Sequence, residues 1–257
     1  MTPDKPTLSD DDLTRFARHI VLKEIGGAGQ ARLRAARIVV IGAGGIGSPA
    51  LQYLVAAGVG RIDIIDDDSI DLSNLQRQTL FGVDDIGTGK VAAAAAALAR
   101  IDPAVTVERR ALRIDAGNAR RVLEGAKVVL DGTDNFATRL AVADAALALR
   151  IPLVSAAVSQ FEGQLSVYRG WEADRPCYRC FVGSDPDRDG ATCADVGVLG
   201  AMAGVMGSLA ALEVIRSIVP FGEDSAGKLL LADGLSLRFR TIALPKDPGC
   251  SCSCPVP

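Results

Sequence analysis

The sequence predicts an α/β fold in which a mostly parallel, doubly wound sheet carries helices on both faces. The first observation is a βαβ unit: short apolar segments at 37–41 and 61–65 flank a glycine-rich turn and a helical pattern at 48–57. The second is that strand and helix patterns keep alternating after this unit, as parallel sheets require. The third is that all six cysteines lie in the last third of the 257-residue chain. Together they indicate a Rossmann-like sheet with a zinc-tied C-terminal part.

The remaining elements are expected in chain order. An amphipathic helix over 9–24 is capped by Ser9, ended by the glycines at 26–29 and followed by a short helical piece through residue 34. Residues 171–195 are polar and contain cysteines, which is typical of a loop. Further helices are expected at 90–100, 118–124, 136–149 and 198–218, and further strands at 105–109, 127–131, 153–156, 164–168, 228–232 and 236–241.

No internal repeat and no linker divides the chain, so we expect one domain over residues 1–257. Its N-terminal helices would lie within 8–34 and its nucleotide-binding βαβ core within 37–156. The part within 157–257 would carry the cysteines.

Composition excludes several classes of function. The net charge is −3 and the pI is near 5.3, so nothing predicts binding along a nucleic-acid backbone. The N-terminus lacks the cationic and then apolar pattern of a secretory signal, which predicts a cytoplasmic protein. The uncharged stretch before Glu213 is expected to be a helix packed inside the protein, not a membrane span. His19 is the only histidine, so the mechanism should work without one.

A glycine-rich turn follows the first predicted strand and precedes a helix. It reads GAGGIG over 42–47, so Gly42, Gly44, Gly45 and Gly47 let backbone N–H groups approach a phosphate. Asp66 ends the next strand, where an acidic group accepts hydrogen bonds from ribose hydroxyls. This context predicts a nucleotide site and leaves open NAD, FAD or ATP.

Two cationic residues downstream favour ATP. Arg77 follows the second strand of the unit, and Lys90 opens the next predicted helix after Gly87-Thr88-Gly89. A dinucleotide pyrophosphate is served by backbone N–H groups, whereas a departing pyrophosphate gains charge that cations stabilise. Either residue alone would be read as a solvated surface charge. Their combination after the glycine-rich turn favours a triphosphate.

The cysteine spacing predicts a structural zinc site. Cys177 and Cys180 form a C-x-x-C pair whose two thiolates can bind one ion, and the other ligands are expected from the C-terminal tail. A redox role is the weaker alternative, because the pair is not expected to open a helix in a thioredoxin-like unit. Four thiolate ligands would leave no open position for a substrate.

The chain resembles the ubiquitin-activating-enzyme-like adenylyltransferases, with the greatest similarity to molybdopterin-synthase adenylyltransferase and its thiamine-pathway and HesA-type relatives. The resemblance covers nearly the whole chain, and SNLQRQ followed by D-x-T-D-N is its most specific part. The shared strings are GAGGIGS (42–48), DDDSIDLSNLQRQ (66–78), GTGK (87–90), DGTDNFATR (131–139), EGQLSVY (162–168), PCYRC (176–180), TCADVGV (192–198) and the DPGC tail (247–250).

This resemblance implies ATP-dependent adenylation, with Mg²⁺, of the C-terminal glycine carboxylate of a ubiquitin-like sulfur carrier. The carrier would end in Gly-Gly, be MoaD-like or ThiS-like, and bind to the part within 157–257. The residues implied at the nucleotide are Gly45 and its neighbours, Asp66, Ser73, Asn74, Arg77 and Lys90, and Asp134 is implied at magnesium and the reacting phosphate, with Asn135 beside it.

Three further expectations come from the resemblance. Arg18 matches an arginine that reaches into the partner subunit's active site, which implies a homodimer. The chain carries no appended rhodanese-like domain, so a separate protein would donate sulfur. Cys193 matches a cysteine linked in some relatives to covalent sulfur transfer, although a small buried loop residue explains it equally well.

The cysteine tail departs from the family pattern. A second C-x-x-C is expected there, but the tail reads Cys250-Ser-Cys252-Ser-Cys254, with Ser253 at the partner position. Cys250 with either Cys252 or Cys254 would complete four ligands. Two alternatives to the adenylyltransferase remain: an NAD-dependent oxidoreductase, suggested by the glycine turn and Asp66 alone, and a non-catalytic partner subunit. A helix N-cap before 136–149 is a competing role for Asp134.

Overall fold

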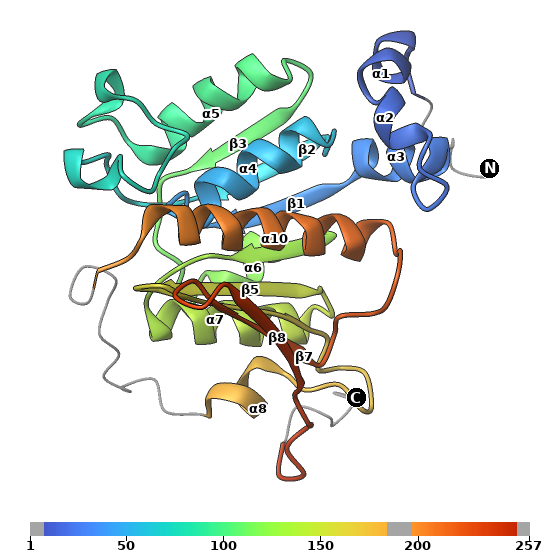
Figure 1. Cartoon of the computed structure of the whole chain (residues 1–257), viewed down its shortest axis with the longest axis vertical. Coiled ribbons are helices and arrows are strands. Elements are labelled where there is room, and N and C mark those ends of the chain that lie inside the picture. Colours follow the sequence, from blue (N-terminus) through green and yellow to red (C-terminus); the bar gives the residue numbers. More distant parts are fainter. Residues whose placement is uncertain (1–7, 184–196, 251–257) are drawn as a thin grey trace.

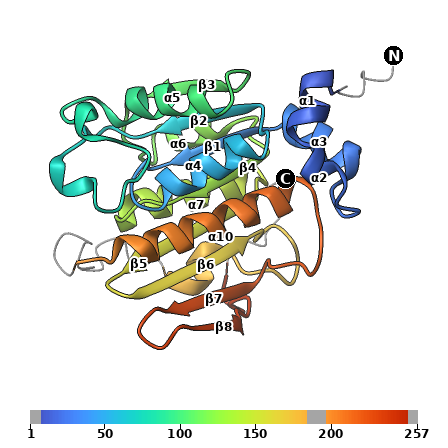
Figure 2. The same cartoon turned by 45° about the horizontal axis from the view of Figure 1, so that its top comes forward.

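Strand β1 (Arg37–Ile41) lies in the interior of one eight-stranded sheet because its residues are apolar on both sides. In this computed structural model, which describes residues 8–183 and 197–250, Ile38 and Val40 belong to one buried cluster, and Val39 and Ile41 belong to another. A strand buried on both faces needs helices on both faces. Helices α4 (Gly47–Ala56), α5 (Lys90–Ile101) and α10 (Gly200–Ile218) cover one face, and α6 (Ala119–Leu123) and α7 (Phe136–Ala148) cover the other (Figures 1 and 2).

The sheet order is β3-β2-β1-β4-β5-β6-β7-β8. The first five strands of this order are parallel and the last three pair antiparallel, so the sheet is mixed and its parallel half is doubly wound. The strands not yet placed are β2 (Arg61–Ile65), β3 (Thr106–Arg110), β4 (Val128–Asp131), β5 (Leu153–Ser159), β6 (Glu162–Tyr168), β7 (Lys228–Asp233) and β8 (Arg238–Ala243). This confirms the predicted α/β class.

The N-terminal region differs from the single helix expected over 9–24. Ser9 caps as predicted, accepting a hydrogen bond from the Asp12 N–H at 3.1 Å, but the chain forms α1 (Asp10–Arg15) and α2 (Ala17–Ile20). The helices separate at Phe16, which is buried and lies beneath the guanidinium of Arg34 at 5.1 Å. Burial of this ring therefore sets a direction change that helical periodicity does not reveal.

Three other segments depart from the sequence expectation. The glycines expected to end the first helix instead begin α3 (Gly26–Ala35). Residues expected to be loop within 171–195 include the short helix α8 (Tyr178–Val182). The last strand lies two residues later than expected, because β8 pairs Arg238 with Asp233 through Ala243 with Lys228. Two 3-10 turns, Leu72–Asn74 and Val83–Asp85, are the remaining elements within residues 8–183 and 197–250.

Helix α10 is long and apolar enough to cross a membrane by length and composition. It instead packs against α4, β5 and β6, and Met206, Ala210 and Val214 are fully enclosed. Glu213 is also buried on this helix and accepts a hydrogen bond from the Ser225 hydroxyl. The expectation of a helix packed inside the protein is therefore confirmed.

A buried carboxylate forms ion pairs with arginines of the three neighbouring strands β1, β2 and β3. Asp63 is inaccessible to solvent, and its oxygens lie 2.8 Å from the Arg37 guanidinium, 3.3 Å from that of Arg61 and 3.1 Å from that of Arg110. Burial alone would raise the pKa of Asp63, but hydrogen bonds and charge attraction from these arginines outweigh it and lower the pKa below the ordinary 3.8. The ionised form is thus stabilised in the folded state.

We expect Asp63→Asn to lower the free energy of unfolding by about 3 kcal/mol at neutral pH, because it removes one partner of a buried ion network. The folded pKa is the lower one, so this stabilisation is complete above pH 3.8 and is lost as pH falls through the folded value. Urea unfolding at pH 7 and pH 3 measures both effects, with the exposed Asp84→Asn as control. Equal losses at the two pH values would contradict the assignment.

Candidate active site

A cavity of about 820 Å³ opens at the carboxyl ends of β1, β2, β4 and β5. The strand order reverses between β1 and β4, which is where doubly wound sheets bind ligands. The lining includes Gly42, Gly44, Gly45, Asp66, Asn74, Arg77, Lys90, Asp134, Asn135 and Arg139. The cavity therefore gathers most of the residues that the sequence predicts for a nucleotide site.

The glycine-rich turn needs glycine for two different reasons. Gly42 has φ +86°, a backbone conformation that residues with side chains rarely adopt. At Gly47 an added Cβ would lie 1.9 Å from the Gly42 carbonyl oxygen, so that glycine lets α4 start directly behind the turn. Gly47 is not among the lining residues. It supports the turn, and Gly44 and Gly45 face the cavity.

Asp66 fastens this turn to the end of β2. Its carboxylate accepts hydrogen bonds from the Ala43 N–H at 2.8 Å and from the Asp68 N–H at 2.9 Å. Burial raises the pKa of Asp66, against the opposing effects of Lys90 and these two hydrogen bonds. Asp66 therefore shapes the turn in addition to lining the cavity, where the predicted ribose contact would be made.

The two predicted cationic residues share the cavity wall. The ammonium of Lys90, at the start of α5, is almost fully buried and lies 2.7 Å from a carboxylate oxygen of the exposed Asp68. The Arg77 guanidinium donates to the Ser73 carbonyl oxygen at 3.0 Å, and its stem lies against Gly45. Ser73 itself does not line the cavity, so it holds Arg77 through its backbone.

Two polar residues after β4 have different roles: Asn135 caps a helix, and Asp134 lines the cavity. Asn135 is the N-cap of α7 and accepts a hydrogen bond from the Thr138 N–H at 2.9 Å. The competing idea that Asp134 caps this helix is therefore wrong. Asp134 is exposed on the loop and lines the cavity. Asn74 likewise lines the cavity, and its side-chain oxygen accepts from the Asp71 N–H at 3.2 Å.

Arg139 is a site residue that the sequence reasoning missed. Its guanidinium is buried in the cavity wall and donates to the carbonyl oxygens of Thr133 and, at 2.8 Å, Ala156. Burial opposes its charge, but the nearby carboxylate of Asp131 and the hydroxyl of Tyr178 outweigh this and raise the pKa of Arg139. The only sequence signal was its place in the DGTDNFATR string, on the apolar side of a predicted helix.

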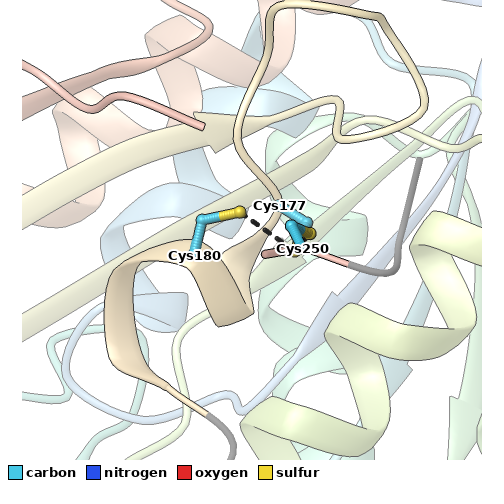
Figure 3. A group of neighbouring side chains, drawn as sticks. All are labelled: Cys177, Cys180 and Cys250. Carbon is cyan, nitrogen blue, oxygen red and sulfur yellow. Dashed lines mark hydrogen bonds between the residues drawn. The ribbon is translucent and has the colours of Figure 1, made fainter. Parts of the chain in front are cut away.

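Three cysteines meet where α8 begins (Figure 3). The Cys177 sulfur lies 3.6 Å from the sulfurs of both Cys180 and Cys250. Tetrahedral zinc with Zn–S bonds of about 2.3 Å places its sulfurs about 3.8 Å apart, so these three thiols fit that ion. Cys252, Cys254 and Cys193 lie outside the described residues.

The C-x-x-C pair lies at the start of a short helix, with Cys177 as the N-cap residue of α8, but not in the thioredoxin-like unit that a redox role would need. That helix has only five residues and follows an irregular segment. The redox motif of a thioredoxin-like unit would instead follow a strand directly. Convergence of a third cysteine from the distant tail favours metal binding over a two-cysteine redox role.

We expect Cys177→Ser and Cys250→Ser each to weaken zinc binding by more than about 100-fold, because even outer-shell changes at metal sites cost 10- to 100-fold. Competition with a chromophoric chelator measures the affinity. Cys193→Ser is the matched control and should bind zinc like the unmodified chain. Separate Cys252→Ser and Cys254→Ser variants would identify the fourth ligand. Unchanged zinc affinity in Cys250→Ser would refute the site.

Arg18 is not part of this cavity. It is exposed on α2. The N-terminal helices lie beside the amino end of β1 (Figure 1), whereas the cavity lies at the carboxyl ends of the strands. The Gly60 N–H donates to the Leu33 carbonyl oxygen, which confirms that α3 lies where β2 starts. Within one chain, Arg18 and the cavity therefore lie at opposite ends of the parallel strands.

Known proteins resemble this chain over most of its length. The ThiF family model matches residues 16–254. The SAMP-activating enzyme E1 of Haloferax volcanii is 42% identical over 247 residues, covering 95% of this chain and 90% of that protein. The sulfur carrier protein adenylyltransferase of Thermus thermophilus is 41% identical, covering 93% and 90%. The adenylyltransferase and sulfurtransferase MOCS3 of Anopheles gambiae is 44% identical, but this chain covers only 55% of it.

Solved structures show the same fold. A crystal structure of E. coli MccB with MccA-N7isoASN has a TM-score of 0.82 at 24% identity, covering 93% of this chain and 74% of that one. A PaaA structure has a TM-score of 0.77 at 20% identity, covering 94% and 76%. The glycine turn, the two cationic residues and the Asp134 loop thus occur in a sequence whose relatives are named adenylyltransferases. The chain belongs to the ThiF family and is itself an adenylyltransferase.

Proposed function

We propose that this protein adenylates the C-terminal glycine carboxylate of a ubiquitin-like sulfur carrier, using ATP and Mg²⁺. The observation that carries the proposal is the one cavity wall shared by the glycine turn, Arg77, Lys90 and Asp134. The relatives named for SAMP activation and for sulfur carrier adenylation support the same substrate class.

The described residues fit a triphosphate. Gly44 and Gly45 leave the turn open toward the cavity at the start of α4, where backbone N–H groups favour an anion. An added Cβ at Gly45 would lie 3.2 Å from the Ala203 Cβ, so the turn is already close-packed on its other side. Lys90 and Arg77 would hold the phosphates, and Asp66 would accept hydrogen bonds from the ribose.

The proposed reaction needs no general base. A carboxylate oxygen of the carrier forms a bond to the α-phosphorus, the bond from that phosphorus to the bridging oxygen of the β-phosphate breaks, and pyrophosphate leaves with the electron pair. The obstacle is the approach of two anions, which Arg77 and Lys90 reduce by neutralising charge and positioning the reactants. Bound magnesium, held by Asp134, would supply further charge neutralisation. The single histidine takes no part.

Arg18 completes the proposal through a second chain. Because it lies at the sheet edge opposite its own cavity, we assign it to the active site of the other subunit of a homodimer. A separate protein would provide sulfur after the acyl-adenylate forms, and the reaction would take place in the cytoplasm. The thiols of Cys177, Cys180 and Cys250 would hold a structural zinc ion.

A non-catalytic partner subunit is the remaining alternative. It would be expected to lack some of the cations or the loop carboxylate, yet Arg77, Lys90 and Asp134 line one cavity here. An NAD-dependent oxidoreductase is disfavoured by the family and by the buried Lys90 beside the glycine turn.

ATP–pyrophosphate exchange with purified protein, Mg²⁺ and a panel of carriers ending in Gly-Gly tests this proposal. Exchange that depends on one carrier would establish the reaction and assign the protein to molybdopterin, thiamine or another thio-cofactor route. A carrier lacking its last glycine is the matched control and should give none. Tight ATP binding without exchange for any carrier would favour the non-catalytic subunit.

A further inference from the structure

The short helix α8 joins the cysteine cluster to the helix that follows the Asp134 loop. Cys177 and Cys180 stand on either side of Tyr178, whose ring is buried and meets the Tyr168 ring edge-to-face at 5.4 Å. Arg179 makes two hydrogen bonds to the Asp144 carboxylate of α7, at 2.8 Å and 2.7 Å. This ion pair joins α8 to the side of α7.

Tyr178 continues this link toward the cavity. Its hydroxyl faces the buried guanidinium of Arg139 on α7, and both side chains line the same cavity wall. Arg139 in turn donates to the carbonyl oxygens of Ala156, in β5, and Thr133, the residue directly before Asp134. A buried donor or acceptor that loses its hydrogen-bond partner costs free energy. Arg139 therefore keeps the Asp134 loop in place as long as its own contacts on the other side remain intact.

We infer that Tyr178 and Arg139 are positioning residues that couple metal occupancy of the cysteine cluster to the position of the Asp134 loop. A metal bound by Cys177, Cys180 and Cys250 fixes the start of α8, Tyr178 fixes Arg139, and Arg139 fixes the Thr133 carbonyl. The inference deepens the proposed function, on which it rests for the role of Asp134 at the nucleotide.

A coupling of this kind is reciprocal. If zinc favours the loop position that binds MgATP, then MgATP must tighten zinc by the same factor. A cluster that merely fastens the C-terminal segment would show no such effect, because the nucleotide would not sense it. The affinity of zinc with and without nucleotide therefore separates coupling from a simple structural role.

The first experiment titrates the full-length chain with zinc against a chromophoric chelator, with and without MgATP. We expect MgATP to tighten zinc binding at least ~5-fold in the unmodified chain. Tyr178→Phe, which keeps the ring and removes only the hydroxyl, should reduce the effect below twofold. Tyr53→Phe, at an exposed tyrosine on α4, is the matched control and should keep the full effect. No nucleotide effect in a chain that binds MgATP, or a full effect in Tyr178→Phe, would overturn the inference.

A second measurement needs neither a variant nor a nucleotide. Amide hydrogen exchange of residues 133–135 should speed up when zinc is removed, whereas residues 38–41 of β1 should keep their protection. Equal exchange at 133–135 with and without zinc would also overturn the coupling. Because this arm omits ATP, failure of the proposed reaction and failure of the coupling give different results.

Discussion

Asp134→Ala is expected to lower carrier-dependent ATP–pyrophosphate exchange by about 10³-fold, the upper end for loss of one group that stabilises a charged transition state. The fold should be unaffected. Asp134 is exposed, and the cap of α7 is supplied by Asn135. Exchange rates and thermal unfolding of the same preparation measure the two quantities together.

The matched control is Asp84→Asn, at an exposed acidic residue outside the cavity, which should change neither quantity. Asn135→Ala gives a useful contrast, because loss of a helix cap costs about 1 kcal/mol of stability. An Asp134→Ala protein with exchange within threefold of the unmodified chain would remove Asp134 from the mechanism. A large fall in melting temperature would instead assign it a structural role.

Arg18→Ala is expected to lower exchange by more than about 10²-fold, although Arg18 lies far from the cavity of its own chain. The reason is that it would act in the cavity of the other subunit. Mixing equal amounts of Arg18→Ala and Asp134→Ala chains should then restore activity. Random pairing would make half of the dimers mixed. One of the two active sites in each mixed dimer would contain neither substitution, so the mixture should show about a quarter of full activity.

Two results would contradict this assignment. One is an Arg18→Ala protein that retains full exchange, and the other is a mixture that forms mixed dimers without regaining activity. Lys23→Ala removes a highly exposed charge from the same region and is the matched control. Labelled subunits followed by native mass spectrometry would confirm that mixed dimers form.

Strands β1, β2, β4 and β5 of the parallel half could be predicted because they are largely buried on both faces. The continuous apolar run at 37–41 and its counterpart at 61–65 read directly as interior strands, and the glycines after the first one mark the turn. The break at Phe16 and the helix α8 could not be predicted in this way. Each depends on a tertiary contact, the burial of Phe16 under Arg34 or the packing of Tyr178 on Tyr168.

The site residues divide in the same manner. The structure brings to one cavity a set of residues that lie in the turns and helix starts following predicted strands: Gly44, Gly45, Asp66, Arg77, Lys90 and Asp134. Ser73 is expected at the nucleotide; in the structure its backbone carbonyl accepts a hydrogen bond from Arg77, and it is not among the residues that line the cavity. Arg139 was missed because its importance comes from burial beside Asp131 and Tyr178, which a residue pattern does not show.

The most direct test of adenylation follows the phosphates of ATP. Two reactions would be run with the protein, Mg²⁺ and the carrier that supports exchange, one with ATP labelled at the α-phosphate and one with label at the γ-phosphate. We predict that the α-label appears on the carrier and the γ-label in pyrophosphate. Gamma-label on the carrier, with none from the α-phosphate, would show phosphoryl transfer and contradict the account.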